Sequence, residues 1–205
     1  MPANVLVTGG AGYIGSHAVL ALRDAGHAVT VIDDLSTGFR WAVPADVPFH
    51  FGDIGNADLL AEIFKAQGIG AVMHFAGSVV VPESVSDPLK YYYNNTAKTR
   101  SLIASAVTGG VKHFIFSSTA AVYGNPKSVP VTEEAAPDPM SPYGSSKLMT
   151  EIILRDTAFA GRAGRRSCAD AEHALAVELA PAEQRLLEPG LVAGPFSCPI
   201  PGPAI

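Results

Sequence analysis

The sequence has few cysteines, few charged residues and no long apolar run, and each scarcity excludes a class of protein. Its two cysteines, Cys168 and Cys198, are spaced neither as metal ligands nor as a disulfide framework. Charged residues make up 16% of the chain and the net charge is -5, so the sequence has no basic stripe for nucleic acid. No segment approaches the roughly 20 consecutive apolar residues of a membrane-spanning helix. We therefore expect a protein with no bound metal, no nucleic-acid partner and no membrane segment.

The N-terminus lacks the features of a secretory signal. The residues "MPANVLVTGG" have no positively charged stretch before the apolar ones and pass directly into a strand pattern. Hydrophobic residues make up 48% of the 205 residues, which is enough for the core of one globular domain or slightly more. With so few cysteines, this composition favours a cytoplasmic protein.

Residues 4–34 have the pattern of a dinucleotide-binding unit. A short apolar strand pattern at 4–8 is followed by Gly9, Gly12 and Gly15, then by a helical pattern and by a second strand pattern that ends at Asp33. The glycines let the backbone approach a pyrophosphate at the helix N-terminus. An acid at Asp33 can accept hydrogen bonds from an adenosine ribose and disfavours a 2′-phosphate, which predicts NAD rather than NADP. The alternative is an ordinary βαβ unit with a glycine-rich turn.

Strand and helix patterns continue to alternate along the chain. We expect further strands at 47–54, 70–77 and 111–119, and helices at 58–68, at 84–108 and from Ser141 onward. This order predicts an α/β fold with a Rossmann-type, doubly wound parallel sheet. Ligands bind such sheets outside the carboxyl ends of the strands. Five residues end or follow a strand and should lie along that edge: Gly9, Asp33, Asp53, Gly77 and Thr119.

The stretch "SPYGSSK" (141–147) predicts a pair of reactive side chains. Ser141 suits a helix N-cap and Pro142 suits the first helical position, so Tyr143 and Lys147 should lie four residues apart on one helix face. A free phenol titrates near pH 10, too high for a base at neutral pH, but a nearby ammonium favours the phenolate. The pair could therefore act as a base. The alternative is a surface tyrosine beside a solvated lysine.

Five motifs occur in a characteristic order: "TGGAGYIG", "GDI", "HFAG", "FSSTAAVYG" and "SPYGSSK". Together they resemble the extended short-chain dehydrogenase/reductase family, in its NAD-dependent epimerase/dehydratase group, from about residue 3 to residue 158. The resemblance implies NAD as cofactor and a UDP-sugar as substrate. It implies interconversion of UDP-glucose and UDP-galactose through a 4-keto sugar, with a reductase or decarboxylase of sugar nucleotides as the alternative.

The resemblance also assigns roles to residues. Tyr143 would remove the proton from the sugar 4-hydroxyl, Lys147 would lower the pKa of Tyr143 and hold the nicotinamide ribose, and Thr119 would hydrogen-bond the same sugar oxygen. The cofactor-binding residues implied are Gly9, Gly12, Tyr13, Ile14, Gly15, Asp33, Asp53, Ile54, Phe75, Ala76, Gly77, Asn94, Tyr143 and Lys147.

Several of these residues have simpler interpretations. Asp53 is also a turn cap, Asn94 an ordinary polar helix residue, and Thr119 a hydroxyl that satisfies local backbone. His74, inside an apolar strand, is better explained as a hydrogen-bonded core histidine than as a catalyst. Related dehydratases carry an Asp-Glu pair directly after the threonine, whereas alanines follow Thr119, which argues against elimination of water.

The resemblance ends near residue 159, where the composition changes. Residues 160–205 contain 10 Ala and 6 Pro, and all six lysines precede them. We expect an NAD-binding domain at 1–159 and a divergent, mostly irregular tail at 160–205, so that the sheet is incomplete at its C-terminal side and the substrate domain is missing. A changed reading frame near residue 160 would explain the tail. This organisation predicts weak or absent turnover with NAD binding retained, and the alternative function is a non-catalytic NAD-binding remnant. Family members pair through two helices resembling 84–108 and 141–158, which suggests a homodimer.

Overall fold

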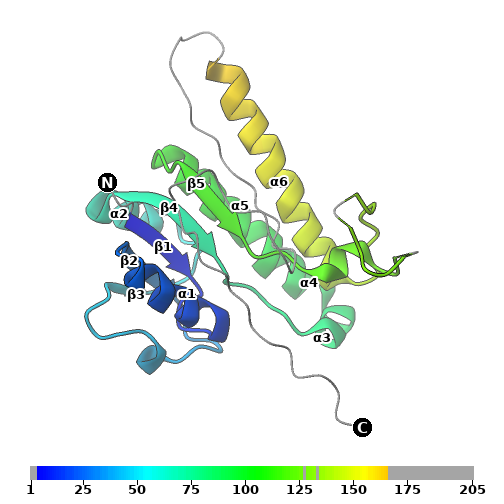
Figure 1. Cartoon of the computed structure of the whole chain (residues 1–205), viewed down its shortest axis with the longest axis horizontal. Helices are drawn as coiled ribbons and strands as arrows, with labels where there is room; N and C mark the ends of the chain where they lie inside the picture. Colours follow the sequence, from blue (N-terminus) through cyan, green and yellow to red (C-terminus); the bar gives the residue numbers. More distant parts are fainter. Residues whose placement is uncertain (1–3, 127, 133, 166–205) are drawn as a thin grey trace.

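A parallel β-sheet forms the centre of the described structure. The computed structural model describes residues 4–126, 128–132 and 134–165 (Figure 1). Its five strands run in the order β3-β2-β1-β4-β5, and every neighbouring pair is parallel. Their bounds are β1 (Asn4–Thr8), β2 (Ala28–Asp33), β3 (Phe49–Phe51), β4 (Ile69–His74) and β5 (His113–Phe116). The strand order reverses between β1 and β4, which is where ligands bind in folds of this type.

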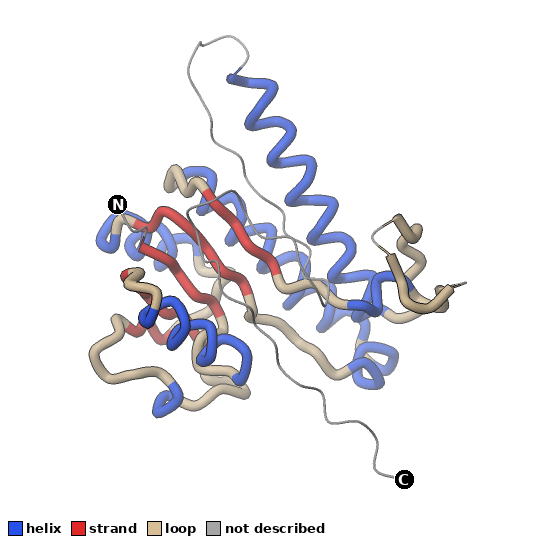
Figure 2. The backbone as a smooth tube through the Cα atoms, in the orientation of Figure 1, coloured by secondary structure: helices blue, strands red, loops and turns tan. Residues whose placement is uncertain are grey.

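Helices cover both faces of this sheet (Figure 2). The longer helices are α1 (Tyr13–Asp24), α2 (Ala57–Gln67), α5 (Lys98–Thr108) and α6 (Pro142–Arg165). The short segments are α3 (Val81–Ser86), α4 (Pro88–Tyr91), η1 (Arg40–Ala42), the π-helical η2 (Tyr92–Ala97) and η3 (Ala120–Tyr123). The Rossmann-type, doubly wound α/β fold predicted from the sequence is confirmed.

Two hydrophobic clusters, one on each face, hold the helices to the sheet. On one face, α1 packs through Val19 and Leu22 against Val5 and Val7 of β1. On the other face, α2, α5 and α6 pack against residues such as Leu6 and Phe114. Successive residues of β1 thus point to opposite faces, and both faces are apolar, as expected of a parallel strand buried on two sides.

Local signals fix the ends of the helices. Asn56 caps α2, because its side chain accepts a hydrogen bond from Leu59 N at 3.1 Å. Gly68 ends α2 in the left-handed conformation, with φ of +59°. The expected cap of α6 is also present, since Ser141 Oγ accepts a hydrogen bond from Gly144 N at 3.2 Å.

The helix expected at 84–108 is correct for most of its length but begins later than predicted. The chain is helical without a gap from Pro88 to Thr108, through α4, the π-helical η2 and α5, and Asp87 separates this stretch from α3. Pro88 has no N–H and forces the preceding residue out of the helical region, and Asp87 accordingly has φ of -135°. Asp87 then caps α4 by accepting a hydrogen bond from Lys90 N at 3.2 Å. The strands expected at 47–54, 70–77 and 111–119 are also shorter than predicted, because ladder pairing ends before the loops that follow them.

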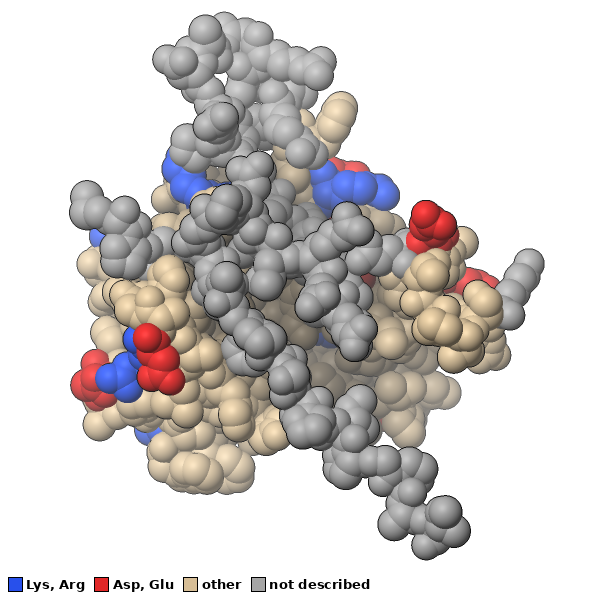
Figure 3. Space-filling view, viewed as in Figure 1, with Lys and Arg blue, Asp and Glu red and all other residues tan. Residues whose placement is uncertain are grey.

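Helix α6 continues to Arg165, past the boundary expected at residue 159. Residues 166–205, most of the predicted tail, lie outside the described residues, so the domain division stays a prediction. Among the helices described, none has the length and apolar character needed to cross a membrane. In the same residues, no group of three or more His, Cys, Asp or Glu side chains is arranged to hold a metal ion. In Figure 3, anionic and cationic side chains of the described part lie side by side at the left of the view.

Candidate cofactor and catalytic site

The glycine turn between β1 and α1 is too tight for side chains. A Cβ atom at Gly15 would lie 2.1 Å from Gly9 O, and one at Gly9 would lie 2.7 Å from Ala76 N. The first N–H groups of any α-helix have no intrahelical partner, and Gly12, the N-cap of α1, has no side chain that could accept a hydrogen bond from them. Tyr13 and Ile14 at this end are 80% and 59% exposed. Free N–H groups and the positive end of a helix fit an anion such as a pyrophosphate.

Asp33, at the end of β2, is hydrogen-bonded to the glycine turn. Its side chain is buried, and Asp33 Oδ2 accepts a hydrogen bond from Ala11 N at 2.9 Å. Asp33 Oδ1 accepts a second one from Leu35 N at 2.8 Å. Each carboxylate oxygen retains a free lone pair, so Asp33 still has acceptor capacity for a ribose hydroxyl.

Asp53 and Ile54 lie beyond β3, farther along the same edge. Asp53 Oδ1 accepts a hydrogen bond from Gly55 N at 2.7 Å, so this residue does cap a turn. Asp53 Oδ2 also forms an ion pair of 2.5 Å with Lys98 Nζ, a contact that the sequence did not indicate. The Ile54 side chain is buried in the hydrophobic cluster, which leaves its backbone as the part that a ligand could reach.

The end of β4 connects the glycine turn with α6. Ala76 N donates to Thr8 Oγ1 at 3.4 Å, and Phe75 N donates to Thr8 O at 3.1 Å. A Cβ atom at Gly77 would lie only 2.9 Å from Asn95 Oδ1 and 3.7 Å from Lys147 Nζ. The three residues predicted to line the cofactor cleft therefore lie between the glycine turn and the predicted catalytic lysine.

The two asparagines of η2 differ in their surroundings. Asn94, the predicted cofactor contact, is half-buried and donates to Ser78 Oγ at 3.1 Å. Asn95 is fully buried, accepts from Ser78 N at 2.7 Å, and donates to Ser78 O and to Ser146 Oγ at 3.0 and 3.1 Å. It ties the loop after β4 to α6, a positioning role that sequence reasoning missed because the doubled "NN" does not say which residue points inward.

Tyr143 and Lys147 both lie on the buried face of α6, with 9% and 4% exposure. Lys147 Nζ donates to Ser117 O at 3.0 Å and lies 4.8 Å from the centre of the Phe116 ring. Burial lowers the pKa of Lys147 to about 8, so the side chain is still mainly an ammonium at neutral pH. The interpretation of Lys147 as a solvated surface residue is therefore wrong.

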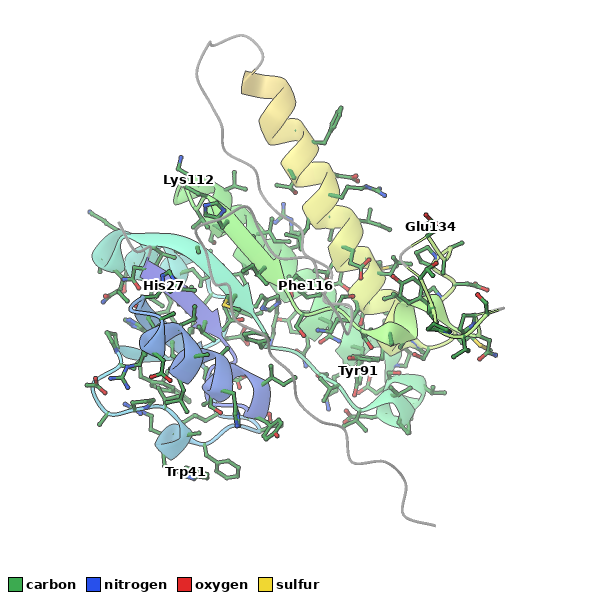
Figure 4. The ribbon with its side chains drawn as sticks, viewed as in Figure 1. His27, Trp41, Tyr91, Lys112, Phe116 and Glu134 are labelled. Atoms are coloured by element: carbon green, nitrogen blue, oxygen red, sulfur yellow. The ribbon has the colours of Figure 1, made fainter. Side chains whose placement is uncertain are left out.

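A second tyrosine holds the ring of Tyr143. The rings of Tyr91 and Tyr143 meet edge to face, with centroids 6.3 Å apart and planes at 88°. The hydroxyl of the buried Tyr91 lies 2.6 Å from Val80 O and 2.8 Å from Glu83 Oε2, so it is firmly anchored. Figure 4 labels Tyr91 and Phe116, both near the start of α6.

Thr119 lies three residues beyond β5 and caps η3. Thr119 Oγ1 accepts a hydrogen bond from Ala121 N at 3.2 Å, so the hydroxyl satisfies local backbone, as the simpler interpretation held. The hydroxyl hydrogen remains available to donate to a ligand. No described contact joins Thr119 directly to Tyr143, and the two residues come to the same region through β5 and α6.

His74 is a core residue. Its Nδ1 lies 2.6 Å from Thr8 Oγ1 and its Nε2 lies 2.8 Å from Thr99 Oγ1, so both ring nitrogens are hydrogen-bonded. Burial, with a smaller contribution from the charge of Lys147, lowers the pKa of His74 to about 3. The ring is therefore neutral at physiological pH, in agreement with the prediction from the sequence.

Comparison with known proteins matches the chain to one family of enzymes and to relatives within it. The model of the NAD dependent epimerase/dehydratase family matches residues 5–164. The UDP-glucose 4-epimerase of Azospirillum brasilense is 58% identical over 156 residues, which are 76% of this chain and 45% of that protein. The UDP-glucose 4-epimerase of Lactobacillus helveticus is 49% identical over 150 residues, covering 73% of this chain and 46% of that protein. The chain thus spans less than half the length of these relatives.

Solved structures show the same similarity. The UDP-glucose 4-epimerase of Brucella ovis in complex with NAD matches with a TM-score of 0.75 and 45% identity, over 77% of this chain and 48% of that one. The enzyme of Bifidobacterium longum in complex with NAD+ and UDP matches with a TM-score of 0.73 and 39% identity, over 77% of this chain and 49% of that one.

Proposed function

The chain belongs to the NAD dependent epimerase/dehydratase family, and we propose that it is the cofactor-binding and catalytic part of a UDP-glucose 4-epimerase. The observation that carries the proposal is the position of Lys147. Its buried ammonium lies beside Ser117 after β5 and beside Gly77 after β4, at the sheet edge that also holds the glycine turn. Lys147 is a buried cation near the glycine turn, and the buried phenol of Tyr143 lies one helical turn away from it. These are the groups that a proton-transfer site requires.

The residues present fit NAD. The uncapped start of α1 suits the pyrophosphate, and the acceptor capacity of Asp33 suits a ribose diol rather than a phosphate. Gly77 lies next to Lys147, and a side chain at this position would clash with Asn95 Oδ1. Asp53, Ile54 and Asn94 are assigned here to the rim of the same site. When bound, NAD supplies the hydride acceptor and later returns the hydride.

The protein itself handles the proton. Tyr143, as phenolate, takes the proton from the sugar 4-hydroxyl while C4 is oxidised, and it gives the proton back when C4 is reduced from the other face. The ammonium of Lys147 stabilises negative charge on the phenol oxygen. Thr119 donates its hydroxyl hydrogen to the same sugar oxygen. The net result is inversion at C4 without net oxidation.

The substrate is inferred from relatives. The relatives from Azospirillum brasilense and Lactobacillus helveticus are UDP-glucose 4-epimerases by name, and the enzyme of Bifidobacterium longum was crystallised with NAD+ and UDP. Binding energy from a remote nucleotide normally positions the reacting sugar. Since the chain spans less than half the length of the relatives, we expect the 205-residue polypeptide alone to bind NAD and to turn over UDP-galactose slowly.

The test uses two tyrosine variants. Tyr143→Phe should abolish conversion of UDP-galactose to UDP-glucose in a coupled assay while NADH affinity, measured by fluorescence titration, stays unchanged. Tyr93→Phe is the matched control, because Tyr93 is 62% exposed and its described contact is the ring face toward Lys98, which phenylalanine keeps. Full turnover by Tyr143→Phe would refute the assignment, and NADH binding without turnover by the unchanged chain would favour a non-catalytic NAD-binding remnant.

We also propose a homodimer. A groove of about 660 Å³ runs between η2, α5 and α6. It is lined mainly by apolar surface, from Tyr92, Thr96, Ala97, Arg100, Ser101, Met149 and Ile153. These residues belong to the two helical regions through which family members were expected to pair.

A further inference from the structure

Helix α6 holds the chain beyond β5 at two consecutive residues. Lys147 Nζ donates to Ser117 O at 3.0 Å, and Ser118 Oγ donates to Glu151 Oε1. Lys147 and Glu151 are four residues apart, so they lie on the same helix face. The helix that bears Tyr143 therefore also fixes the segment that leads into Thr119.

The segment has few other restraints in the described structure. Ser117 N donates to His74 O at 3.2 Å, which ends the pairing of β5 with β4. The next described backbone contact is from Val122 N to Thr119 O, also at 3.2 Å, and belongs to η3. Between these two points, Ser118 is held through its side chain. The contact to Glu151 is therefore the described hydrogen bond that holds Ser118, between the end of β5 and the local hydrogen bonds of Thr119 in η3.

Glu151 is suited to this contact. Its side chain is half-buried, and burial raises the pKa of its carboxyl while the hydrogen bond from Ser118 opposes that shift. None of the described ion pairs includes Glu151. A carboxylate without a cationic partner that is partly removed from water depends on the hydrogen bond it accepts, and the bond gains strength from the charge.

We propose that Glu151 is a positioning residue: by holding Ser118 Oγ, it keeps the hydroxyl of Thr119 in place relative to Tyr143. The inference rests on the proposed function for the role of Thr119, but the contact itself does not. Ser118 and Glu151 act through one shared hydrogen bond. Removing either side chain should therefore displace Thr119 to the same extent, and removing both should add little.

The first measurement needs neither cofactor nor turnover. In a spectrum of the chain with labelled threonine methyl groups, the Thr119 signal is identified by its loss in Thr119→Ser. Glu151→Ala and Ser118→Ala should each move or broaden that signal to the same extent, and the double variant should not increase the change. Glu151→Gln, which keeps an acceptor oxygen, should restore much of the original position. The signal of the buried Thr99 is the internal reference.

The second measurement is kinetic. Glu151→Ala should lower kcat about tenfold, as expected for a misplaced hydrogen-bond donor, with the dissociation constant of NADH unchanged. Glu62→Gln, an exposed glutamate of α2, is the control and should match the unchanged chain. An unaltered Thr119 methyl signal in Glu151→Ala overturns the proposal, and so does a normal kcat. If the unchanged chain shows no turnover, the proposed function fails while the methyl measurement still decides the role of Glu151.

Discussion

At the scale of single residues, burial sets the pKa of the lysine in the candidate site. Lys147 is 4% exposed and its pKa is lowered to about 8, whereas in an unfolded chain it would titrate near 10.5. Its ammonium is retained at neutral pH with one hydrogen bond to Ser117 O and the face of Phe116. A buried charge with so few partners reduces stability. We interpret that cost as the consequence of keeping a cation beside Tyr143.

This burial predicts an unusual pH dependence of stability. Between pH 8 and pH 10.5 the unfolded chain binds more protons at Lys147 than the folded one does, so the free energy of unfolding should rise with pH across this window. Relative to Lys147→Met, which has no titrating group, the rise should amount to about 3 kcal/mol. Urea unfolding of both proteins at pH 7.5 and pH 10.5 measures it. A constant difference between them at the two pH values would show that Lys147 is not buried as described.

At the scale of elements, the glycine turn combines two separate requirements. Gly15 is needed for packing, because a Cβ there would strike the carbonyl oxygen of Gly9 at 2.1 Å. Gly12 is less confined, because a Cβ atom there would have its nearest neighbour, again Gly9 O, at 3.3 Å. Its place at the start of α1 makes it a residue that a pyrophosphate would approach.

Alanine at each position should separate folding from binding. Gly15→Ala should lower both the melting temperature and the affinity for NADH, because the turn itself must move. Gly12→Ala should keep a melting temperature close to that of the unchanged chain and lose affinity for NADH by more than about tenfold, since the methyl group blocks a phosphate. Thermal unfolding and fluorescence titration distinguish the two. Normal NADH affinity in Gly12→Ala would contradict the assignment of this turn to the cofactor.

At the scale of the whole molecule, the groove between η2, α5 and α6 is the surface that we assign to self-association. If a second copy covers it, Met149→Glu should yield a monomer, because the charge would be buried in an apolar interface. Phe159→Glu, farther along α6 at a residue that is 68% exposed and does not line the groove, should leave the assembly unchanged. Light scattering after gel filtration gives the mass. A monomeric unchanged chain would rule out the dimer.

Much of this architecture follows from signals within short stretches of sequence. The glycine spacing before α1, the acid that ends β2 and the Ser-Pro start of α6 are local features, and each acts through its own backbone. Apolar strand patterns alternating with helical ones are enough to predict a doubly wound sheet. Where a local signal was overlooked, as at Pro88, the helix was predicted to begin too early.

Tertiary structure alone decided how the side chains of the site are held. The contacts of Asn95 with Ser146, of Lys98 with Asp53 and of Ser118 with Glu151 join residues 33 to 51 positions apart, and no periodicity in the sequence reports them. The burial that sets the charge of Lys147 likewise exists only once α6 has packed beside β5. Backbone preference is a property of neighbouring residues, whereas hydrogen bonding and desolvation depend on which distant groups the packed fold brings together.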